Sequence, residues 1–378
     1  MKRLLILTLG AFVWQTTEIL PIGLLPQIAS DLSVSESHVG LLVTGYAWLV
    51  AFSAIPLTVL TERFDRRVLV LVLLTGLTGA NFLAAFVPNY PTLVILRAVV
   101  AFGHGIFWSI IASLATRLAP DIPKSRATAW AFAGIALALV GGIPCATAIG
   151  LWSGWRSAFG AGAILGGIAL ITAALFLPSM PARQSTAIGH GLRRQPALFH
   201  ISVVTALIIT AHFCGYTYVA PLLDRVAGVP AGRLPLLLLA FGVAGLTGNG
   251  LGGWLASHPS RTVLIASLGI IMSQGLITLV NPAPALAWIE MVAWGASASL
   301  LVVGLQSWVL ELAPDNADTA SSLYVAAFNF GIGAGALSGG ITLDTVGLRA
   351  IAGIGAGIGV LALIVFFAGS RRPARFEI

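Results

Sequence analysis

The chain alternates between long apolar runs and short polar breaks. A helix that crosses a bilayer needs about 20 mostly apolar residues. Runs of that length predict twelve membrane spans, at approximately 4–29, 38–60, 68–87, 91–116, 127–149, 157–178, 198–220, 234–255, 263–280, 286–310, 320–343 and 349–370. Together they use about two-thirds of the chain and leave no room for a soluble domain. The pattern therefore predicts an all-α integral membrane protein.

The longest polar segment, PSMPARQSTAIGHGLRRQP, follows the sixth span. It divides the spans into two groups of six. We expect an N-terminal six-helix bundle at 1–178, a cytoplasmic linker at 179–197 and a C-terminal six-helix bundle at 198–378.

The two halves share a spacing of residues. Pro26 and Tyr46 are 20 positions apart, as are Pro221 and Phe241. A repeat of this kind implies two bundles around a pseudo-two-fold axis, with a binding site between them near mid-membrane. Chance similarity between two leucine-rich runs is the alternative.

Charge is scarce and unevenly placed. Charged residues make up 9% of the chain and hydrophobic residues 58%, whereas soluble domains are about 25% charged. This composition excludes a soluble enzyme, a disordered protein and a secreted disulfide scaffold. The net charge of +7 is explained by loop bias and needs no nucleic acid as a partner.

The basic residues also predict the orientation. If the N-terminus is cytoplasmic, 15 of the 20 lysines and arginines fall in inside segments, 4 fall in outside loops, and Arg97 lies within a span. Cytoplasmic loops are enriched in Lys and Arg. We therefore expect both termini in the cytoplasm of a bacterium, with the chain as a multi-pass, monomeric protein of the inner membrane.

Signatures of catalysis are missing from the sequence. It contains no P-loop, no metal-spaced His/Cys cluster and no nucleophile elbow, so it predicts neither an enzyme nor a metal site. Cys145 and Cys214 lie in separate apolar runs and suggest no bridge.

Three motifs resemble those of a known family. TERFDRR (61–67) resembles the cytoplasmic loop signature of the major facilitator superfamily, matched at Glu62, Arg63, Arg66 and Arg67. LRAVVAFGHGIFWS (96–109) resembles the fourth-helix signature of its drug/proton antiporter branch, with the signature arginine at Arg97. GGIPCATAIG (141–150) resembles the fifth-helix antiporter motif, of which Gly142 and Pro144 remain. The resemblance implies the major facilitator fold.

Five longer segments are similar to a narrower group, the sugar efflux transporter B-type exporters. They are TTEILPIGLLPQIA, GYAWLVAFSAIP, AFGHGIFWSIIASLATRLAP, TAHFCGYTY and FNFGIGAGALSG. The resemblance covers the whole chain. It implies proton-driven export of arabinose, thiogalactosides and related compounds, without a cofactor other than the coupling proton.

Three ionisable residues within spans are candidates for proton coupling. Glu18 lies mid-span in the first helix, and Arg97 and His104 share one stripe of the fourth. An ionisable group at mid-bilayer costs about 2.5–3.5 kcal/mol, so it usually marks function. Arg97 is a fixed charge, whereas His104 can titrate, and either could form a proton switch with Glu18. The alternatives are a protonated core carboxyl, a structural lock by Arg97 and a hydrogen-bonded core histidine.

Aromatic and amide side chains at membrane depth are candidates for substrate binding. Aromatic faces stack on CH-rich ligand faces and amides bond hydroxyl groups, which suits sugars or amphiphilic drugs. The candidates are Trp14, Gln15, Tyr46, Phe107, Trp108, His212, Tyr216, Asn249, Gln306 and Asn329. Core packing is the alternative for each residue. Glu290 lies near the outer end of its span, where we expect an interfacial carboxylate.

The sequence thus predicts a proton-coupled antiporter that exports small sugars or drug-like molecules by alternating access. A symporter or uniporter for uptake is the first alternative. A membrane sensor that does not transport is the second, although the soluble domain expected of a sensor is missing from the sequence.

Overall fold

The computed structural model describes residues 2–181, 196–255, 258–279, 284–313 and 317–370. Most of the predicted linker, with the basic residues of the linker and of the C-terminal tail, lies outside these ranges. We call residues 2–181 the first half and residues 196–370 the second half. The exact domain boundaries stay a prediction.

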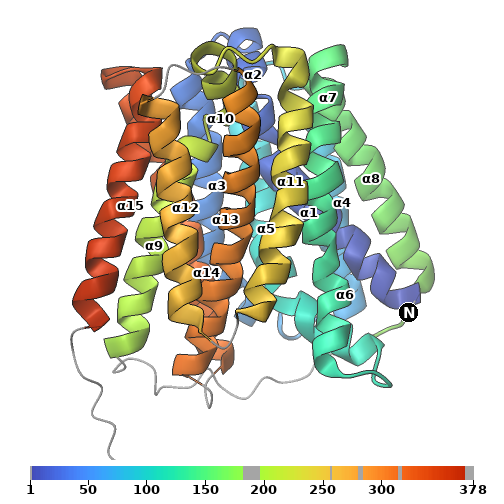
Figure 1. Cartoon of the computed structure of the whole chain (residues 1–378). Coiled ribbons are helices and arrows are strands. Elements are labelled where there is room, and N and C mark those ends of the chain that lie inside the picture. Colours follow the sequence, from blue (N-terminus) through green and yellow to red (C-terminus); the bar gives the residue numbers. More distant parts are fainter. Residues whose placement is uncertain (1, 182–195, 256–257, 280–283, 314–316, 371–378) are drawn as a thin grey trace, which may run out of the picture.

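All regular secondary structure of the described residues is helical (Figure 1). The first half forms α1 (Lys2–Gly23), α2 (Leu25–Asp31), α3 (Glu36–Thr61), α4 (Arg66–Ala84), α5 (Tyr90–Leu118), α6 (Lys124–Leu137), the π-helix η1 (Ala138–Gly142), α7 (Ile143–Ser153) and α8 (Trp155–Phe176). The second half forms α9 (Pro196–Tyr216), α10 (Val219–Pro221), the π-helix η3 (Leu222–Val226), the 3₁₀-helix η4 (Ala231–Arg233), α11 (Leu234–Trp254), α12 (Pro259–Leu279), α13 (Pro284–Leu312), α14 (Ala317–Thr345) and α15 (Leu348–Ser370). Twelve helical segments of the described chain are long and apolar enough to cross a membrane. The predicted helical class and number of spans are confirmed.

The helices carry apolar side chains on their outer faces as well as in the core. Phe52, Phe86 and Leu175 are about 70% exposed, at 68%, 70% and 69%. Soluble proteins rarely expose apolar patches of such extent. A lipid environment removes this cost, because lipid tails are as apolar as these side chains.

One predicted span was wrong in its bounds, and another contains a feature that the sequence did not predict. The run at 4–29 is not one helix: α1 ends at Gly23 and α2 begins at Leu25, with Pro26 in its first turn. The fifth span is continuous but contains the π-helix η1. A hydropathy scan cannot find either feature, because every residue at these breaks is apolar or glycine.

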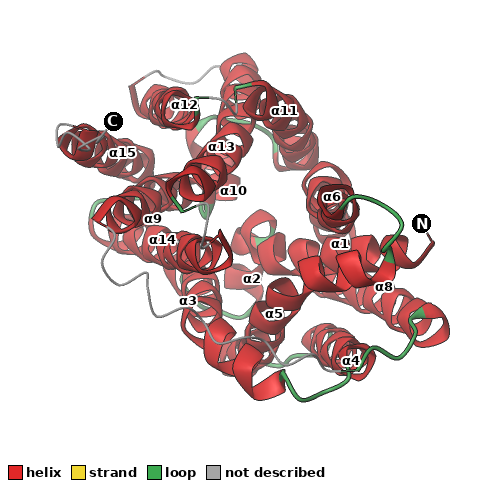
Figure 2. Cartoon of the chain, turned by 90° about the horizontal axis from the view of Figure 1, so that it is seen from below, coloured by secondary structure: helices red, strands yellow, loops and turns green. Residues whose placement is uncertain are grey.

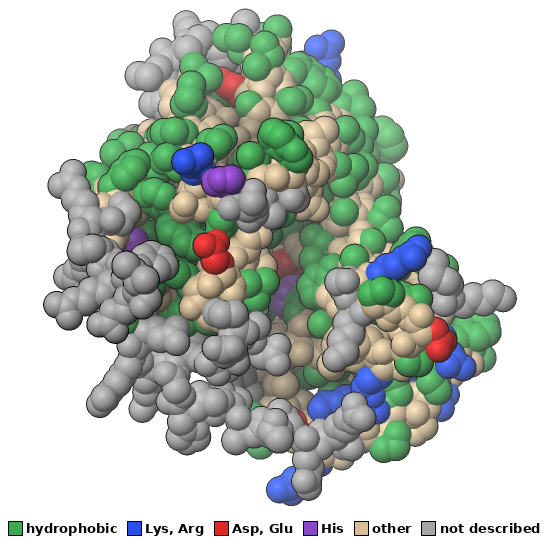
Figure 3. Space-filling model, turned by 60° about the horizontal axis from the view of Figure 1, so that its bottom comes forward, with side chains coloured by type: hydrophobic (Ala, Val, Ile, Leu, Met, Phe, Trp, Pro, Cys, Tyr) green, Lys and Arg blue, Asp and Glu red, His purple; other side chains and the backbone are tan. Residues whose placement is uncertain are grey.

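The two halves lie side by side and separate toward one end. Figure 2 shows the helices of the first and second halves as two groups when the molecule is viewed from below. In the space-filling view the lower face is hollowed between them, and acidic and histidine side chains are visible inside the hollow (Figure 3). The loop between α3 and α4, with Arg63, Arg66 and Arg67, and the last turn of α5, with Arg117, lie at this end, which we call the basic end; the opposite end is the far end.

Contacts between the halves close the far end. Arg225 forms an ion pair with Glu36 across the interface. Gly40 of α3 leaves room for the Tyr218 hydroxyl, which would lie 2.0 Å from a Cβ atom at that position. Further along α3, Thr44 Oγ1 donates to Gly333 O of α14 over 3.1 Å. The hollow therefore does not extend through to the far end.

The fifth-helix motif lies at a second contact between the halves. Pro144 has no N–H to offer the carbonyl four residues earlier, and the π-helix η1 lies directly before α7, which contains it. A Cβ on Gly142 would lie 2.1 Å from Thr16 Oγ1 of α1. On the other side of η1, a Cβ on Gly242 of α11 would lie 2.2 Å from Leu139 O. The motif thus forms a thin, glycine-lined contact among α1, η1 and α11.

The loop between α3 and α4 is held by Asp65. Its Oδ1 atom accepts from the backbone N–H groups of Arg67 and Val68 and so caps α4. Its Oδ2 atom accepts from Ser179 Oγ and Met180 N, at 2.7 and 2.8 Å. The hydrogen bond from Ser179, with those from the backbone, lowers the pKa of the Asp65 carboxyl. The loop is therefore tied to the segment where the first half ends.

The other motif residues of this loop differ in burial. Arg66 is buried and donates to Thr61 O, whereas Arg67 donates to Ala174 O of α8 over 2.7 Å. Glu62 is the C-cap of α3, and Arg63 is exposed. Two of the four predicted residues thus hold helix ends within the first half.

We predict that Asp65→Ala lowers the free energy of unfolding by about 0.5–2 kcal/mol, the usual cost of losing an N-cap. The folded pKa lies below the unfolded value of about 3.9. The stabilisation is therefore present above the unfolded pKa and disappears as the pH falls through the folded pKa. Thermal unfolding of the purified protein at neutral and at acidic pH measures this difference. Asp121→Ala is the control, because Asp121 is exposed and forms no hydrogen bond or ion pair with the described residues. An equal loss in both variants would contradict the prediction.

Candidate functional site

Glu18 lies within a polar cluster at mid-height of the first half. Gln15 Nε2 donates to Glu18 Oε2 over 2.9 Å within α1. His104 of α5 places Nε2 at 4.0 Å from the same oxygen, and its Nδ1 is 2.8 Å from the Tyr46 hydroxyl of α3. The side chains of His104 and Glu18 are 6% and 14% exposed. A carboxyl and an imidazole thus face each other with little solvent around them.

Arg97 does not bind the Glu18 carboxylate. Its two terminal nitrogens donate to the backbone carbonyls of Thr17 and Glu18, at 2.6 and 2.8 Å. Pro21, four residues after Thr17, lacks the N–H that would normally bond the Thr17 carbonyl. The guanidinium also lies over the Tyr46 ring, 4.3 Å from its centroid. Arg97 therefore supplies the donor that the proline removes, and joins α5 to α1.

Aromatic rings surround His104. The Trp14 ring meets it edge-on with centroids 5.7 Å apart, and Trp14 stacks on Phe107 at 5.6 Å. Trp108 lies on the other side of the imidazole, at 5.7 Å. The indole nitrogens of Trp14 and Trp108 are buried and have no hydrogen-bond partner among the described residues. Such donors are normally satisfied by water or by a ligand. We call Trp14, Gln15, Glu18, Tyr46, His104, Phe107 and Trp108 the first cluster.

A second aromatic cluster lies in the second half around His212 of α9. Trp294 Nε1 of α13 donates to His212 Nδ1 over 2.9 Å. Because an indole N–H can only donate, His212 is neutral with its proton on Nε2. Tyr216 stacks on His212 at 5.2 Å and on Phe241 of α11 at 4.9 Å. His212 and Tyr216, one turn apart, therefore lie on one face of α9. We call these four residues, with Phe213, the second cluster.

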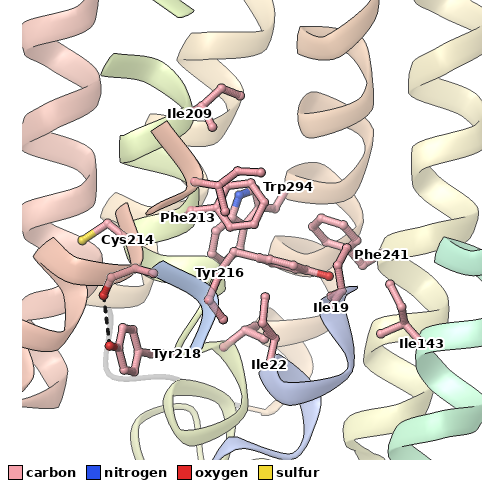
Figure 4. Close-up of a cluster of buried hydrophobic side chains, with 14 of the residues drawn as sticks. Ile19, Ile22, Ile143, Ile209, Phe213, Cys214, Tyr216, Tyr218, Phe241 and Trp294 are labelled. Carbon is pink, nitrogen blue, oxygen red and sulfur yellow. Dashed lines mark hydrogen bonds between the residues drawn. The ribbon is translucent and has the colours of Figure 1, made fainter. Parts of the chain in front are cut away.

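The Tyr216 side chain points toward the first half. In Figure 4 its hydroxyl end lies near Ile19 of α1, whereas Tyr218 turns the other way. The Tyr218 hydroxyl donates to Ala336 O over 3.0 Å, but the Tyr216 hydroxyl forms no hydrogen bond with any described residue. Tyr216 therefore offers a polar group at the boundary between the halves.

The two clusters repeat one arrangement with the helices exchanged. In the first half the tryptophan is on α1 and the histidine on α5; in the second half the histidine is on α9 and the tryptophan on α13. The Trp14–His104 and His212–Trp294 ring pairs have the same centroid distance, 5.7 Å, and interplanar angles of 88° and 89°. Only the first cluster contains a carboxyl group.

Three predicted residues lie apart from both clusters. Asn249 is exposed on α11, and Asn329 donates to Val325 O of its own helix. Gln306 Nε2 donates to Ser321 Oγ near the basic end. In this conformation Asn329 and Gln306 bond to groups of the second half, and a role in binding stays a prediction for all three residues.

Sequence reasoning missed Trp294, Phe241 and Pro21. Trp294 and Phe241 belong to apolar runs, and only the fold shows that they surround His212. Pro21 could have been found, because a proline inside a membrane span always leaves one carbonyl without its helical donor.

Comparison with known proteins places this fold in a family. A sequence model of the family described as the major facilitator superfamily matches residues 7–331. Probable sugar efflux transporters of Helicobacter pylori strains G27 and 26695 are each 34% identical over 369 residues, covering 96% of this chain and 94% of the relative. The chain therefore belongs to the major facilitator superfamily. It is a multi-pass membrane transport protein and not an enzyme, as its sequence predicted.

Solved structures share the fold at low identity. A bacterial homologue of the human lysosomal transporter Spinster, inward-facing and occupied, has a TM-score of 0.80 and 18% identity, covering 97% of this chain and 96% of that one. A D-xylose–proton symporter has a TM-score of 0.77 and 17% identity, covering 96% of each chain. These likenesses support the twelve-helix fold.

We predict that Arg97 and Pro21 are energetically coupled. Arg97→Gln should destabilise the protein by about 1.5–3 kcal/mol, the usual contribution of hydrogen bonds to a charged group. In a Pro21→Ala background the cost should fall, because the new amide can bond the Thr17 carbonyl. A double-mutant cycle on the free energy of unfolding measures this coupling. Additive effects of the two substitutions would show that Arg97 does not act through the carbonyl.

Proposed function

We propose that this protein exports small hydroxyl-bearing molecules, sugars in the first place, across a bacterial inner membrane in exchange for protons. Amphiphilic drug-like molecules with similar polar groups are the second substrate class. The proposal rests chiefly on one observation: a lone carboxyl, Glu18, faces His104 at mid-membrane beside buried, unpartnered indole donors.

The orientation of the chain in the membrane determines to which side the hollow opens. By the positive-inside rule the basic end, where α1 begins and α15 ends, faces the cytoplasm. The hollow opens at this end, and the far end is closed. An exporter loads its substrate in this state. Rocking of the two halves about the clusters, as in related transporters, then exposes the substrate to the other side.

Glu18 and His104 carry the proton in this mechanism. A carboxyl in a poorly solvated site favours its neutral form, and a nearby cation or hydrogen bond favours the ionised form. Closing the hollow changes the solvation of Glu18, and a shift of His104 changes its 4.0 Å separation from the carboxyl. Arg97 stays bound to backbone carbonyls and contributes a fixed positive charge. One proton that crosses about 100 mV releases about 2.3 kcal/mol, enough for a substrate gradient of roughly fiftyfold.

Groups from both halves suit a polyhydroxylated substrate. The indole N–H groups of Trp14 and Trp108 can donate to ligand hydroxyls, and the Glu18 carboxyl can accept. Tyr216 presents a hydroxyl from the second half. The relatives named as probable sugar efflux transporters support sugars over other hydroxylated molecules.

We predict that Glu18→Gln abolishes transport driven by a pH gradient but keeps substrate exchange. Glutamine has the shape of the protonated acid and can still accept from Gln15, but it cannot release a proton. The measurement is accumulation in proteoliposomes under an imposed pH gradient, with counterflow of labelled sugar as the control for binding and rocking. Glu311→Gln changes an exposed carboxyl at the basic end and should behave as wild type.

The same assay distinguishes the alternatives. An antiporter moves sugar in the direction opposite to the flow of protons, and a symporter moves sugar in the same direction as the protons. Transport by a uniporter does not depend on the proton gradient. Full gradient-driven transport by Glu18→Gln would exclude Glu18 from the coupling mechanism.

We further predict that Tyr216→Phe weakens sugar binding by about 0.5–1.5 kcal/mol, the value of one hydrogen bond. Loss of its hydroxyl should barely change the binding of an apolar drug. Tyr218→Phe is the matched control, since that hydroxyl already bonds Ala336 O and its loss should leave sugar affinity unchanged. Binding titrations with one sugar and one apolar ligand measure both effects. Equal sugar affinity in all three proteins would place the substrate elsewhere.

A further inference from the structure

The second half buries a carboxyl that the mechanism above does not use. Glu290 lies in the second turn of α13, toward the far end, and the residue is 4% exposed. The interfacial depth expected from the sequence stays a prediction, but within the protein the side chain is buried. Its Oε2 atom is buried without a hydrogen-bond partner. Among the ion pairs of the described residues, none includes Glu290.

No charged side chain of the described residues forms an ion pair with Glu290. α13 packs against α9, α11, α12 and α14. The titratable or charged residues of these helices and of their far-end flanks are His200, His212, Cys214 and Tyr216 of α9, Tyr218, Asp224 and Arg225 after it, Arg233 before α11, Arg261 of α12, Tyr324 and Asp344 of α14, and Arg349 after it; Asp318 lies in the first turn of α14, at the basic end. Arg261 and Tyr324 also lie toward the basic end, and His212 is neutral. An ionised carboxylate without a partner is strongly disfavoured at such a site.

The natural occupant of this site is a proton. Metal ions need several oxygen ligands, and no group of three or more potential metal-ligating side chains occurs among the described residues. A single carboxyl with an unpartnered oxygen is suited to bind one proton.

The position of Glu290 connects it with the second cluster and with the closed end. Glu290 and Trp294 are one helical turn apart on the buried face of α13, and Trp294 donates to His212. Glu290 lies on the far-end side of that pair, in the part of α13 that is shut off while the far end is closed. Opening of the far end would bring water toward this part of the helix.

We propose that Glu290 is a second proton-binding site, which holds its proton while the far end is closed and exchanges it when the far end opens. The proposal rests on the proton-coupled export described above and adds a second proton to it. Glu18 binds and releases one proton at mid-membrane, and Glu290 binds and releases a second proton toward the far end.

Infrared spectroscopy of the purified protein at neutral pH tests the first part of the proposal without transport. The band of protonated carboxyl groups should shrink in Glu290→Gln and stay in Glu311→Gln, whose carboxyl is exposed on the same helix. An unchanged band in Glu290→Gln would show that Glu290 is ionised and would overturn the proposal. Glu290→Met is the second variant, for use if the glutamine variant does not fold.

Transport tests the second part. The number of protons exchanged per sugar should fall by one in Glu290→Gln, and the dependence of the rate on the pH at the far side should flatten. An unchanged ratio together with an unchanged pH profile would make Glu290 a permanently neutral core residue and overturn the proposal. If Glu18→Gln keeps gradient-driven transport, the coupling assigned to Glu18 fails, while the proton bound at Glu290 is still detected by its infrared band.

Discussion

A backbone polar group that is buried in a membrane protein, away from any water-filled cavity, must find its partner inside the protein, because lipid offers none. At Pro21 the helix α1 violates this requirement, and Arg97 of α5 repairs it with a hydrogen bond of 2.6 Å to Thr17 O. Arg97 also donates to Glu18 O, so the repair fixes α1 against α5 directly at Glu18. The carboxyl on α1 and the imidazole of His104 on α5 therefore meet because a proline needed a donor from another helix.

The sequence predicted the fold well because the bilayer imposes one strong pattern, long apolar helices between polar breaks. The sequence-based prediction failed where the backbone conformation changes although the polarity of the residues does not. The break after Gly23 and the π-helix before Pro144 lie within apolar runs, so hydropathy cannot reveal them. Proline is the signal in both places, since it removes a donor and restricts the residue before it.

The site was predictable only where a residue was polar in an apolar context. Glu18, Arg97 and His104 stood out for this reason, and the structure brings them together. The hydrogen-bond partner of Arg97 did not follow from the sequence, because backbone carbonyls carry no sequence signature. Trp294 was missed for the opposite reason: its role comes from one N–H group on a side chain that otherwise counts as apolar, and only the packing of α9 against α13 reveals its acceptor.

The repeated histidine–tryptophan pairs give the two halves the same framework and different chemistry. His212 has its Nδ1 committed to an indole donor, so its tautomer is fixed. His104 faces a tyrosine hydroxyl, which can donate or accept, so either of its tautomers can be satisfied. A framework that is symmetric in shape thus holds a chemically fixed histidine in one half and an adaptable one beside a carboxyl in the other. Of the two histidines, His104 is therefore the one that has both a carboxyl oxygen at 4.0 Å and a hydrogen-bond partner that suits either tautomer.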